Sequence, residues 1–420
     1  MLIRVFALLL LLLPQDPAIK ALVDKLASDE IAERDAAASE LVKLGPATLP
    51  QLRTFVATAA GDQKVLLIAV IRQLERLIKK DEIVRGPRIT LAGGVRPVAQ
   101  IFADIARQAG CRIDVEGVPA DAKVDASLSQ VPLAKAVDQV CKAHGGIMYA
   151  YSAQRIIIEP KPYREFPRLF HEGVLFFLDH LLLDRVPSVA TPRMLLKPVI
   201  AWPPGAGPLA YRLETATLVD DLGTDLLTGN QPPSWIWFRG PVGDTLCSPL
   251  YYHSFPGGVP DGATRIASWK GILRLRFPVE MKPAISIEKP FDAPPGGKAD
   301  GLYQLRLHSA KLVGRDASIS VLISTPLKDD PEVDYYNLGL ANLLVLRDSK
   351  GGMIRGEGQT RAGTGAPHKE EGRATRWLEF SYKVPEGAVV TSLDLMKLDD
   401  LEDVEIPFDF KDIKIREAAR

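Results

Sequence analysis

The sequence carries no net charge, because 52 basic side chains balance 52 acidic ones over 420 residues. Proteins that bind nucleic acid or an anionic membrane through their overall charge have a cationic excess, so neither class is indicated. Beyond residue 13, no apolar run approaches the roughly 18 residues that a membrane-spanning helix requires. We therefore expect no nucleic-acid partner and no transmembrane segment in the mature chain.

Cysteine is also scarce. The chain has only Cys111, Cys141 and Cys247, too few for a disulfide-stabilised scaffold and without the paired spacing of a zinc site. Cys111 alternates with Ile113 and Val115 on one face of a predicted strand, whereas Cys141 lies on the apolar face of a predicted helix. Because those two faces should meet, a Cys111–Cys141 disulfide stays open, although buried free thiols are the simpler interpretation.

Catalytic motifs are missing as well. His171-Glu172 is not followed by the second histidine of a zinc protease, and no Gly-x-Ser-x-Gly sequence marks a nucleophilic serine. His144 precedes Gly145-Gly146 at a predicted helix end, where an imidazole interacts favourably with the helix dipole. The sequence therefore predicts a protein that is not an enzyme, with no catalytic residue, no metal ligand, no cofactor-binding residue and no cofactor.

Two groups of residues nevertheless leave alternatives open. The first is a set of acidic clusters, namely Asp220, Asp221 and Asp225; Asp329, Asp330, Glu332 and Asp334; and Asp399, Asp400, Glu402 and Asp403. Oxygen-rich loops can bind calcium, and paired carboxylates can serve as acid and base in a hydrolase. None of the clusters has the order of an EF-hand, so turns between strands are the simpler interpretation.

The second group is aromatic: Trp202, Trp235, Trp237, Tyr251 and Tyr252. Such side chains can form a stacking platform for a sugar, which would make the protein a carbohydrate-binding or cell-surface module. The alternation of two tryptophans on one strand face is explained more simply by a hydrophobic core.

The N-terminus has the features of a secretory signal peptide, assigned to residues 1–15. Arg4 precedes an unbroken apolar run that ends at Leu13, and Pro14 and Gln15 follow directly. A small-residue cleavage pattern is missing. We expect a periplasmic or secreted protein whose mature chain starts near Gln15.

Residues 16–86 show helical periodicity in four stretches. Asp16-Pro17 is typical of a helix start, and Gly45-Pro46 ends one helix and begins the next. The phrase EIAERDAAASELVKLGPA, which begins at Glu30, resembles the HEAT-type helical repeat of bacterial envelope proteins. Two helix pairs are fewer than a free-standing solenoid needs, so this segment is expected to rest on a neighbour or a partner.

Residues 87–162 change to a small α+β pattern in the order β-α-β-β-α-β-β. The expected strands are 89–92, 112–115, 123–128, 149–151 and 155–159, and the expected helices are 95–108 and 132–144. Since the pattern closes on itself, we expect residues 88–160 to fold as an isolated domain.

Three phrases of this segment, VAQIFADIARQAG, VDASLSQVPLAKAVDQV and RIIIEP, resemble the secretin and TonB short N-terminal domain. In that family the module has no enzymatic activity and binds periplasmic protein partners. No transmembrane barrel or secretin ring is indicated after it here. The resemblance therefore implies the binding role and not the receptor or pore role.

The remaining half has short apolar strands separated by Pro, Gly, Asp and Asn, which is typical of β-sandwiches. We divide it into a β-rich domain at residues 163–284 and a sandwich-like domain at residues 285–420, closed by a strand at 404–408. The glycine-rich stretch 349–372 is predicted to be a loop between strands.

The fold class is thus multidomain: a helical HEAT-like repeat, a small α+β module and all-β sandwich-like domains. The function that follows is an exported, non-enzymatic envelope protein that binds periplasmic or envelope proteins through its first two modules. Carbohydrate binding is the first alternative and hydrolysis by carboxylates of the β-domains is the second.

Overall fold

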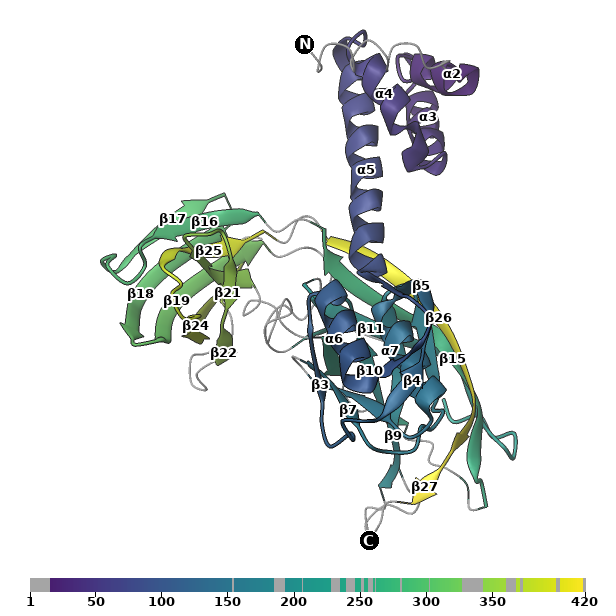
Figure 1. Cartoon of the computed structure of the whole chain (residues 1–420). Coiled ribbons are helices and arrows are strands. Elements are labelled where there is room, and N and C mark those ends of the chain that lie inside the picture. Colours follow the sequence, from purple (N-terminus) through teal and green to yellow (C-terminus); the bar gives the residue numbers. More distant parts are fainter. Residues whose placement is uncertain are drawn as a thin grey trace. The chain divides into compact units, whose positions relative to one another are not determined.

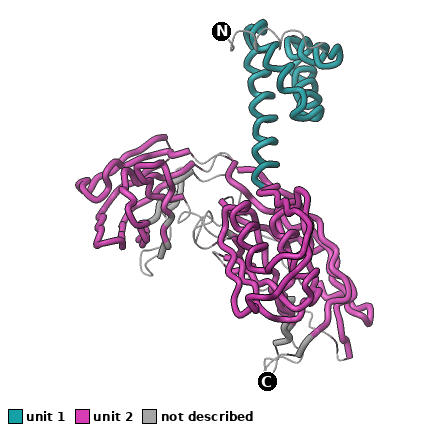
Figure 2. Tube along the Cα trace, viewed as in Figure 1, with its two compact units in different colours: residues 1–83 teal, residues 84–420 magenta. Residues whose placement is uncertain are grey.

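The computed structural model confirms an N-terminal helical region followed by many strands in several sheets (Figure 1). It describes residues 16–152, 155–184, 193–205, 207–227, 235–238, 246–250, 253–255, 260, 262–279, 282–301, 303–326, 343–359, 368–370, 373–397 and 401–417. The predicted signal peptide, residues 1–15, lies outside these residues. Within them the chain forms two compact units, residues 1–83 and 84–420 (Figure 2).

The first unit is helical. Its elements are α2 (Pro17–Lys25), α3 (Ile31–Lys43), the 3-10 helix η1 (Pro46–Thr48), α4 (Leu49–Val56) and α5 (Gly61–Arg85), whose last residues belong to the second unit. Asp16 caps α2, because its Oδ1 atom accepts a hydrogen bond of 2.9 Å from the backbone N–H of Ala18. The buried faces form one core of Ile19, Val23, Leu26, Ala37, Leu41, Leu49, Leu52, Leu67, Val70, Ile71 and Leu74.

The second unit begins with an α+β module. Its elements are β1 (Arg88–Leu91), β2 (Val95–Pro97), α6 (Val98–Ala109), β3 (Arg112–Val115), β4 (Lys123–Asp125), β5 (Leu128–Pro132), α7 (Leu133–His144), β6 (Met148–Tyr151) and β7 (Arg155–Glu159). Strands β3, β7 and β6 form one sheet, and β1–β5 and β2–β4 form two antiparallel pairs. The expected strand 123–128 is therefore divided between β4 and β5, and β2 is an additional strand. Helix α6 ends where Gly110 adopts a left-handed conformation with φ of 66°.

The hydrophobic core of this module does not close on itself. Leu175, Val199 and Ala201, which follow the module in the sequence, belong to the same buried cluster as Ile101 and Phe102 of α6. Leu246 and Cys247 join this cluster from still further along the chain. The module and the first β-region therefore share one core.

This first β-region consists of two sheets. Its strands are β8 (Arg168–His171), β9 (Val174–Asp184), β10 (Arg193–Ala201), β11 (Ala210–Asp220), β12 (Ile236–Trp237), β13 (Cys247–Pro249), β14 (His253–Phe255), β15 (Arg265–Pro278), β26 (Leu401–Lys414) and β27 (Arg416–Glu417). One sheet has the order β13-β10-β9-β27, with β14 on β10 and β8 on β9, and the other has the order β12-β11-β15-β26. Phe176 of the first sheet packs against Trp269, Phe408 and Phe410 of the second at centroid distances of 5.3 to 6.2 Å.

A second β-region, residues 283–396, is inserted between β15 and β26. Its strands are β16 (Pro283–Glu288), β17 (Gly296–Asp300), β18 (Tyr303–Val313), β19 (Asp316–Pro326), β20 (Leu344–Asp348), β21 (Met353–Arg355), β22 (Glu357–Gln359), β23 (His368–Glu370), β24 (Arg373–Lys383) and β25 (Val390–Met396). They form two sheets, β16-β25-β20-β21 and β17-β18-β19-β24-β22, with β23 on β24. We call residues 283–396 the inserted β-region.

The topology corrects the expected place of the C-terminal strand. Strand β26 pairs with β15 from Arg265↔Lys414 to Pro278↔Leu401, so it belongs to the first β-region and not with the strands after residue 285. Between Pro278 and Leu401 lie 122 residues, and the strands within this segment form two sheets of their own.

The glycine-rich stretch 349–372 also differs from the expected loop, since it contains β21, β22 and β23. Gly356 lies where the chain passes from one sheet to the other, and a Cβ atom at this position would come within 2.6 Å of the Tyr382 ring. Glycine is needed here for close packing and not for a loose connection. Residues 360–367, 371 and 372 of this stretch lie outside the described residues.

Among the described helices, none is long and apolar enough to cross a bilayer.

Candidate functional site

A buried carboxylate on helix α7 is the centre of the candidate site. Six further residues of this helix are buried with it: Leu133, Ala134, Ala136, Val137, Val140 and Cys141. Asp138 lies on the same face and is only 5% exposed. A charge in this position requires compensating partners, because transferring an unpaired carboxylate from water into a protein core is strongly unfavourable.

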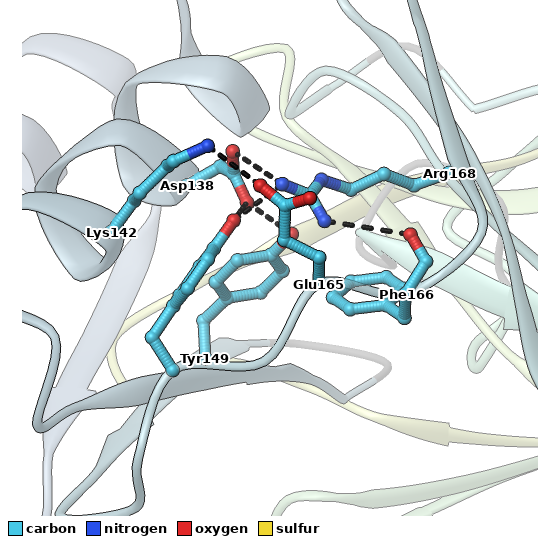
Figure 3. Close-up of polar contacts among 7 residues, drawn as sticks. Asp138, Lys142, Tyr149, Glu165, Phe166 and Arg168 are labelled. Atoms are coloured by element: carbon cyan, nitrogen blue, oxygen red, sulfur yellow. Dashed lines mark hydrogen bonds and ion pairs between the residues drawn. The ribbon is translucent and has the colours of Figure 1, made fainter.

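Three side chains supply those partners (Figure 3). The hydroxyl groups of Tyr149 and Tyr163 donate hydrogen bonds of 3.0 and 2.9 Å to Oδ1 of Asp138. The Nη2 atom of Arg168 lies 3.1 Å from Oδ2 and forms the ion pair of the site. Arg168 also donates to the Tyr163 hydroxyl, and it reaches the carbonyl oxygen of Phe166 at 3.4 Å. We call Asp138, Tyr149, Tyr163 and Arg168 the Asp138 cluster.

The guanidinium of Arg168 is enclosed by aromatic rings. Its central carbon lies 4.9 Å from the ring centroid of Phe166, 5.7 Å from that of Tyr163 and 5.8 Å from that of Phe170. Such contacts stabilise a cation that is shielded from water. The side chains of Arg168 and Asp138 are only 11% and 7% exposed, so the pair is screened little by solvent.

The electrostatics of the cluster fix its protonation state. Burial, followed by the hydrogen bond to Asp138, raises the pKa of Tyr163 to about 12. Burial and the Asp138 charge raise the pKa of Tyr149 well above its ordinary value. Burial lowers the pKa of Arg168, but the attraction of Asp138 and of the two tyrosines together outweighs it, so the pKa lies above the ordinary value. At neutral pH both tyrosines are therefore neutral and Arg168 is charged.

This arrangement serves as a link between elements. The carboxylate of Asp138 accepts from three side chains at once. The cluster joins α7 of the module to strand β8 of the first β-region, next to the core that the two share. An outer pair, Lys142 Nζ to Glu165 Oε1 at 2.6 Å, lies beside it in Figure 3.

The acidic cluster Asp220, Asp221 and Asp225 forms a turn after β11. The Oδ1 atom of Asp220 accepts from the backbone N–H groups of Leu222 at 2.9 Å and Thr224 at 2.8 Å. Asp221 accepts from both the backbone and the hydroxyl group of Thr264, and these bonds, the hydroxyl bond first, lower its pKa.

The calcium alternative for the acidic clusters needs several oxygen ligands close together. Among the described residues, no three His, Cys, Asp or Glu side chains are placed to hold a metal ion. In the third acidic cluster, Asp403 receives two bonds from Arg276, of 2.7 and 2.9 Å. Asp399, Asp400 and the cluster Asp329, Asp330, Glu332 and Asp334 lie outside the described residues.

Of the five aromatic residues of the predicted platform, the two whose side chains the structure describes are buried. Trp202 and Trp235 are 3% and 4% exposed. Trp202 packs against Phe238, with centroids 5.3 Å apart, and the guanidinium of Arg276 lies 3.9 Å from the Trp235 centroid. Tyr251 and Tyr252 lie outside the described residues, as does the side chain of Trp237.

The cysteines and His144 occupy structural positions. Cys111, Cys141 and Cys247 are free thiols that all contact the shared core. Burial raises the pKa of Cys111 to about 11 and, with smaller contributions from nearby acidic charges, raises those of Cys141 and Cys247 to about 12. His144 is the last residue of α7, and its Nδ1 atom accepts from the Gly146 N–H at 3.1 Å.

The Asp138 cluster was missed at the level of the sequence. Its signal is the acidic residue between Val137 and Val140 on an otherwise apolar helix face. Comparison of the chain with protein families, curated sequences and solved structures finds no match.

Proposed function

We propose that this chain is a non-enzymatic, exported envelope protein that binds other proteins through its helical unit and its α+β module. The proposal includes the HEAT-like character of residues 16–86 and the likeness of residues 87–162 to the secretin and TonB short N-terminal domain. It also includes sandwich-like packing of the β-regions and a periplasmic or secreted location.

The observation that carries the binding role is an exposed face on the helical unit. Arg34 of α3 lies 3.5 Å from Asp62 of α5, which brings the N-terminal turns of these two helices together. Ile31 lies one turn before Arg34, and Val65 lies one turn after Asp62. Ile31 and Val65 are 67% and 66% exposed. We take these two exposed apolar side chains, each one turn from the ion pair along its own helix, as the surface that a partner covers.

The α+β module supports this role through its attachment. A module that shares its core and a buried ion pair with the following strands is held in one orientation, which reduces the ordering cost of binding. Acidic and basic side chains of the module pair with one another, as Arg96 does with Asp104 at 3.0 Å.

Affinity capture with matched variants tests the binding role. The tagged full-length chain and an Ile31→Asp/Val65→Asp variant are incubated with envelope extract, and captured proteins are quantified by mass spectrometry. The two new carboxylates on the binding face should reduce the captured amount of the specific partner at least roughly tenfold. Burial of each apolar side chain against a partner contributes more than about 1 kcal/mol of binding free energy, and the variant loses this contribution twice.

The control is Leu222→Asp, which changes a side chain that is 58% exposed in the first β-region. It should capture the partner like the unaltered chain. Equal capture by all three proteins would overturn the binding face, and circular dichroism melts must show that each variant is folded. Export has its own test, because N-terminal sequencing of the native protein should start near Gln15, and retention of residues 1–13 would contradict it.

A further inference from the structure

One end of the inserted β-region carries four large apolar side chains that are exposed to solvent. They are Leu312, Val313, Met353 and Val389, with exposed fractions of 43%, 75%, 40% and 63%. Leu312 and Val313 end strand β18, Met353 begins β21, and Val389 directly precedes β25. We call these four residues the apolar tip.

The hydrogen bonds of three neighbouring turns bring the four residues to the same end. Val313 faces Asp316 across the β18–β19 turn, and the Arg315 carbonyl of that turn accepts a bond of 2.8 Å from the N–H of Val384. The chain then runs to Val389, whose carbonyl accepts a bond of 2.8 Å from the N–H of Ser349.

The third turn follows Ser349. It returns the chain to Met353, which lies opposite Arg347 in the β20–β21 pair. Each of the three turns therefore contacts the next, and each contributes at least one exposed apolar side chain. The segments involved, 309–317, 347–353 and 383–390, all belong to the described residues.

The three segments of the apolar tip contain five basic and three acidic side chains. Lys311, Arg315, Lys350 and Lys383 are exposed within these same segments. Lys383 pairs with Asp316 at 2.7 Å, and Arg315 lies 3.8 Å from Glu386. Among the described residues, Lys311 and Lys350 have no acidic partner.

We propose that the apolar tip inserts into the surface of a phospholipid bilayer. The four side chains come from three separate turns and not from one strand or helix face. A bilayer interface has no fixed shape, so individual side chains can enter the boundary between headgroups and acyl chains. Lys311 and Lys350 are placed to contact anionic headgroups beside them.

This surface is independent of the overall charge, which is zero, and of the binding face on the helical unit. Insertion would hold the inserted β-region at a membrane. The bilayer is recognised by the apolar tip and the partner by Ile31 and Val65, so failure of one proposal does not decide the other.

Vesicle sedimentation with the full chain tests the proposal. Vesicles of phosphatidylcholine with about one lipid in four replaced by phosphatidylglycerol are mixed with the protein at low ionic strength. We expect the unaltered chain to sediment with them. Val313→Asp/Val389→Asp should lower the bound fraction at fixed lipid, with at least a roughly tenfold weaker partition, because two apolar side chains no longer enter the bilayer interface.

The matched control is Val95→Asp/Leu222→Asp, which changes side chains that are 65% and 58% exposed elsewhere in the chain. It should bind like the unaltered protein. Lys311→Glu/Lys350→Glu should weaken binding to anionic vesicles more than binding to pure phosphatidylcholine.

Three outcomes would overturn the proposal. The unaltered chain could fail to sediment with either type of vesicle, or the control could lose as much binding as the Val313→Asp/Val389→Asp variant. The third is self-association of the unaltered chain that the same variant abolishes without any vesicle binding, since the apolar tip would then be an interface between copies. Circular dichroism melts of all variants establish that the comparison is between folded proteins.

Discussion

The helical unit and the α+β module are both short periodic segments in the sequence, but they bury charge differently. In the helical unit the ion pairs lie at the surface, as in Arg53–Glu75, whose side chains are 61% and 41% exposed. In the module Asp138 pairs with Arg168 of the first β-region, and these side chains are only 7% and 11% exposed. The helical unit has a core of its own, whereas the core of the module continues into the first β-region. Two segments of similar length can therefore depend on the rest of the chain to very different degrees.

The largest expected effect is that of Arg168→Met. It leaves the Asp138 charge in the protein interior without its cation, which costs about 3–5 kcal/mol of unfolding free energy. All five tryptophans lie after residue 200, so tryptophan fluorescence during urea unfolding follows the second unit alone. The urea midpoint of the tryptophan transition should fall strongly in this variant.

Arg168→Lys is the control for this variant. It keeps the positive charge but does not stack a planar group on the aromatic rings, so it should destabilise less than Arg168→Met. If both variants unfold at the same urea concentration as the unaltered chain, Arg168 does not stabilise the buried charge of Asp138. Buried and exposed ion pairs would then not distinguish the two regions.

Next in size is the pair Leu175→Ala and Leu52→Ala. Both leucines are 0% exposed, and truncating either should cost about 2–5 kcal/mol. Leu175 lies in the shared core and Leu52 in the core of the helical unit. Leu175→Ala should shift the tryptophan transition, and Leu52→Ala should shift only the helical signal at 222 nm in circular dichroism, a wavelength that reports helix content.

A tryptophan transition that is unchanged in Leu175→Ala would show that the core is not shared. It would also restore the expectation that residues 88–160 fold as an isolated domain. The structure favours the opposite result, because that fragment lacks Leu175, Val199 and Arg168.

The sequence allowed the local elements to be predicted and left their assembly open. Periodicity placed helices near α6 and α7, and Gly110 and Gly145 marked their ends. What periodicity does not contain is which strands become neighbours. The sequence of strand β26 has the same alternating pattern as the other strands near the C-terminus. Only its pairing with β15 in the structure assigns it to the first β-region.

The candidate site shows the same limit. Asp138 is visible as an acidic residue on an apolar face, but its partners Tyr149, Tyr163 and Arg168 come 11, 25 and 30 residues later. Nothing local distinguishes Arg168 from the exposed arginines of the chain. Which charged side chains are buried depends on contacts between residues far apart in the sequence. These contacts form only when the elements pack, so local sequence patterns do not predict them.

A smaller effect is expected for Tyr163→Phe. Tyr149 still donates to Oδ1 of Asp138 in this variant, but the Tyr163 hydroxyl no longer donates to Asp138 or accepts from Arg168. Loss of these two hydrogen bonds should cost about 1–3 kcal/mol at pH 7. The pKa of Tyr163 is raised to about 12, above the ordinary value of about 10 in an unfolded chain. The contribution of this group is therefore fully present below pH 10 and is lost as the pH rises through 12.

Urea midpoints of both proteins, measured from pH 8 to pH 11.5, check whether the stability contribution of Tyr163 is lost as the pH rises. The unaltered chain should lose stability more steeply above pH 10 than Tyr163→Phe, so the two curves should approach each other. Parallel curves over the whole range would show that the Tyr163 hydroxyl does not sense Asp138.

The smallest effect is expected for Arg53→Met in the helical unit. The Arg53–Glu75 distance of 2.7 Å is shorter than the 3.1 Å of the Arg168–Asp138 pair, and distance alone would rank it as the stronger interaction. Exposure reverses that ranking, because exposed pairs are stabilised little by Coulomb attraction in water and lose side-chain entropy when they form. We expect a loss of about 0–1 kcal/mol in the unfolding of the helical unit, and it should shrink further in about 1 M salt, where screening acts within about 3 Å. A loss as large as that of Arg168→Met, and insensitive to salt, would mean that burial does not separate the two regions.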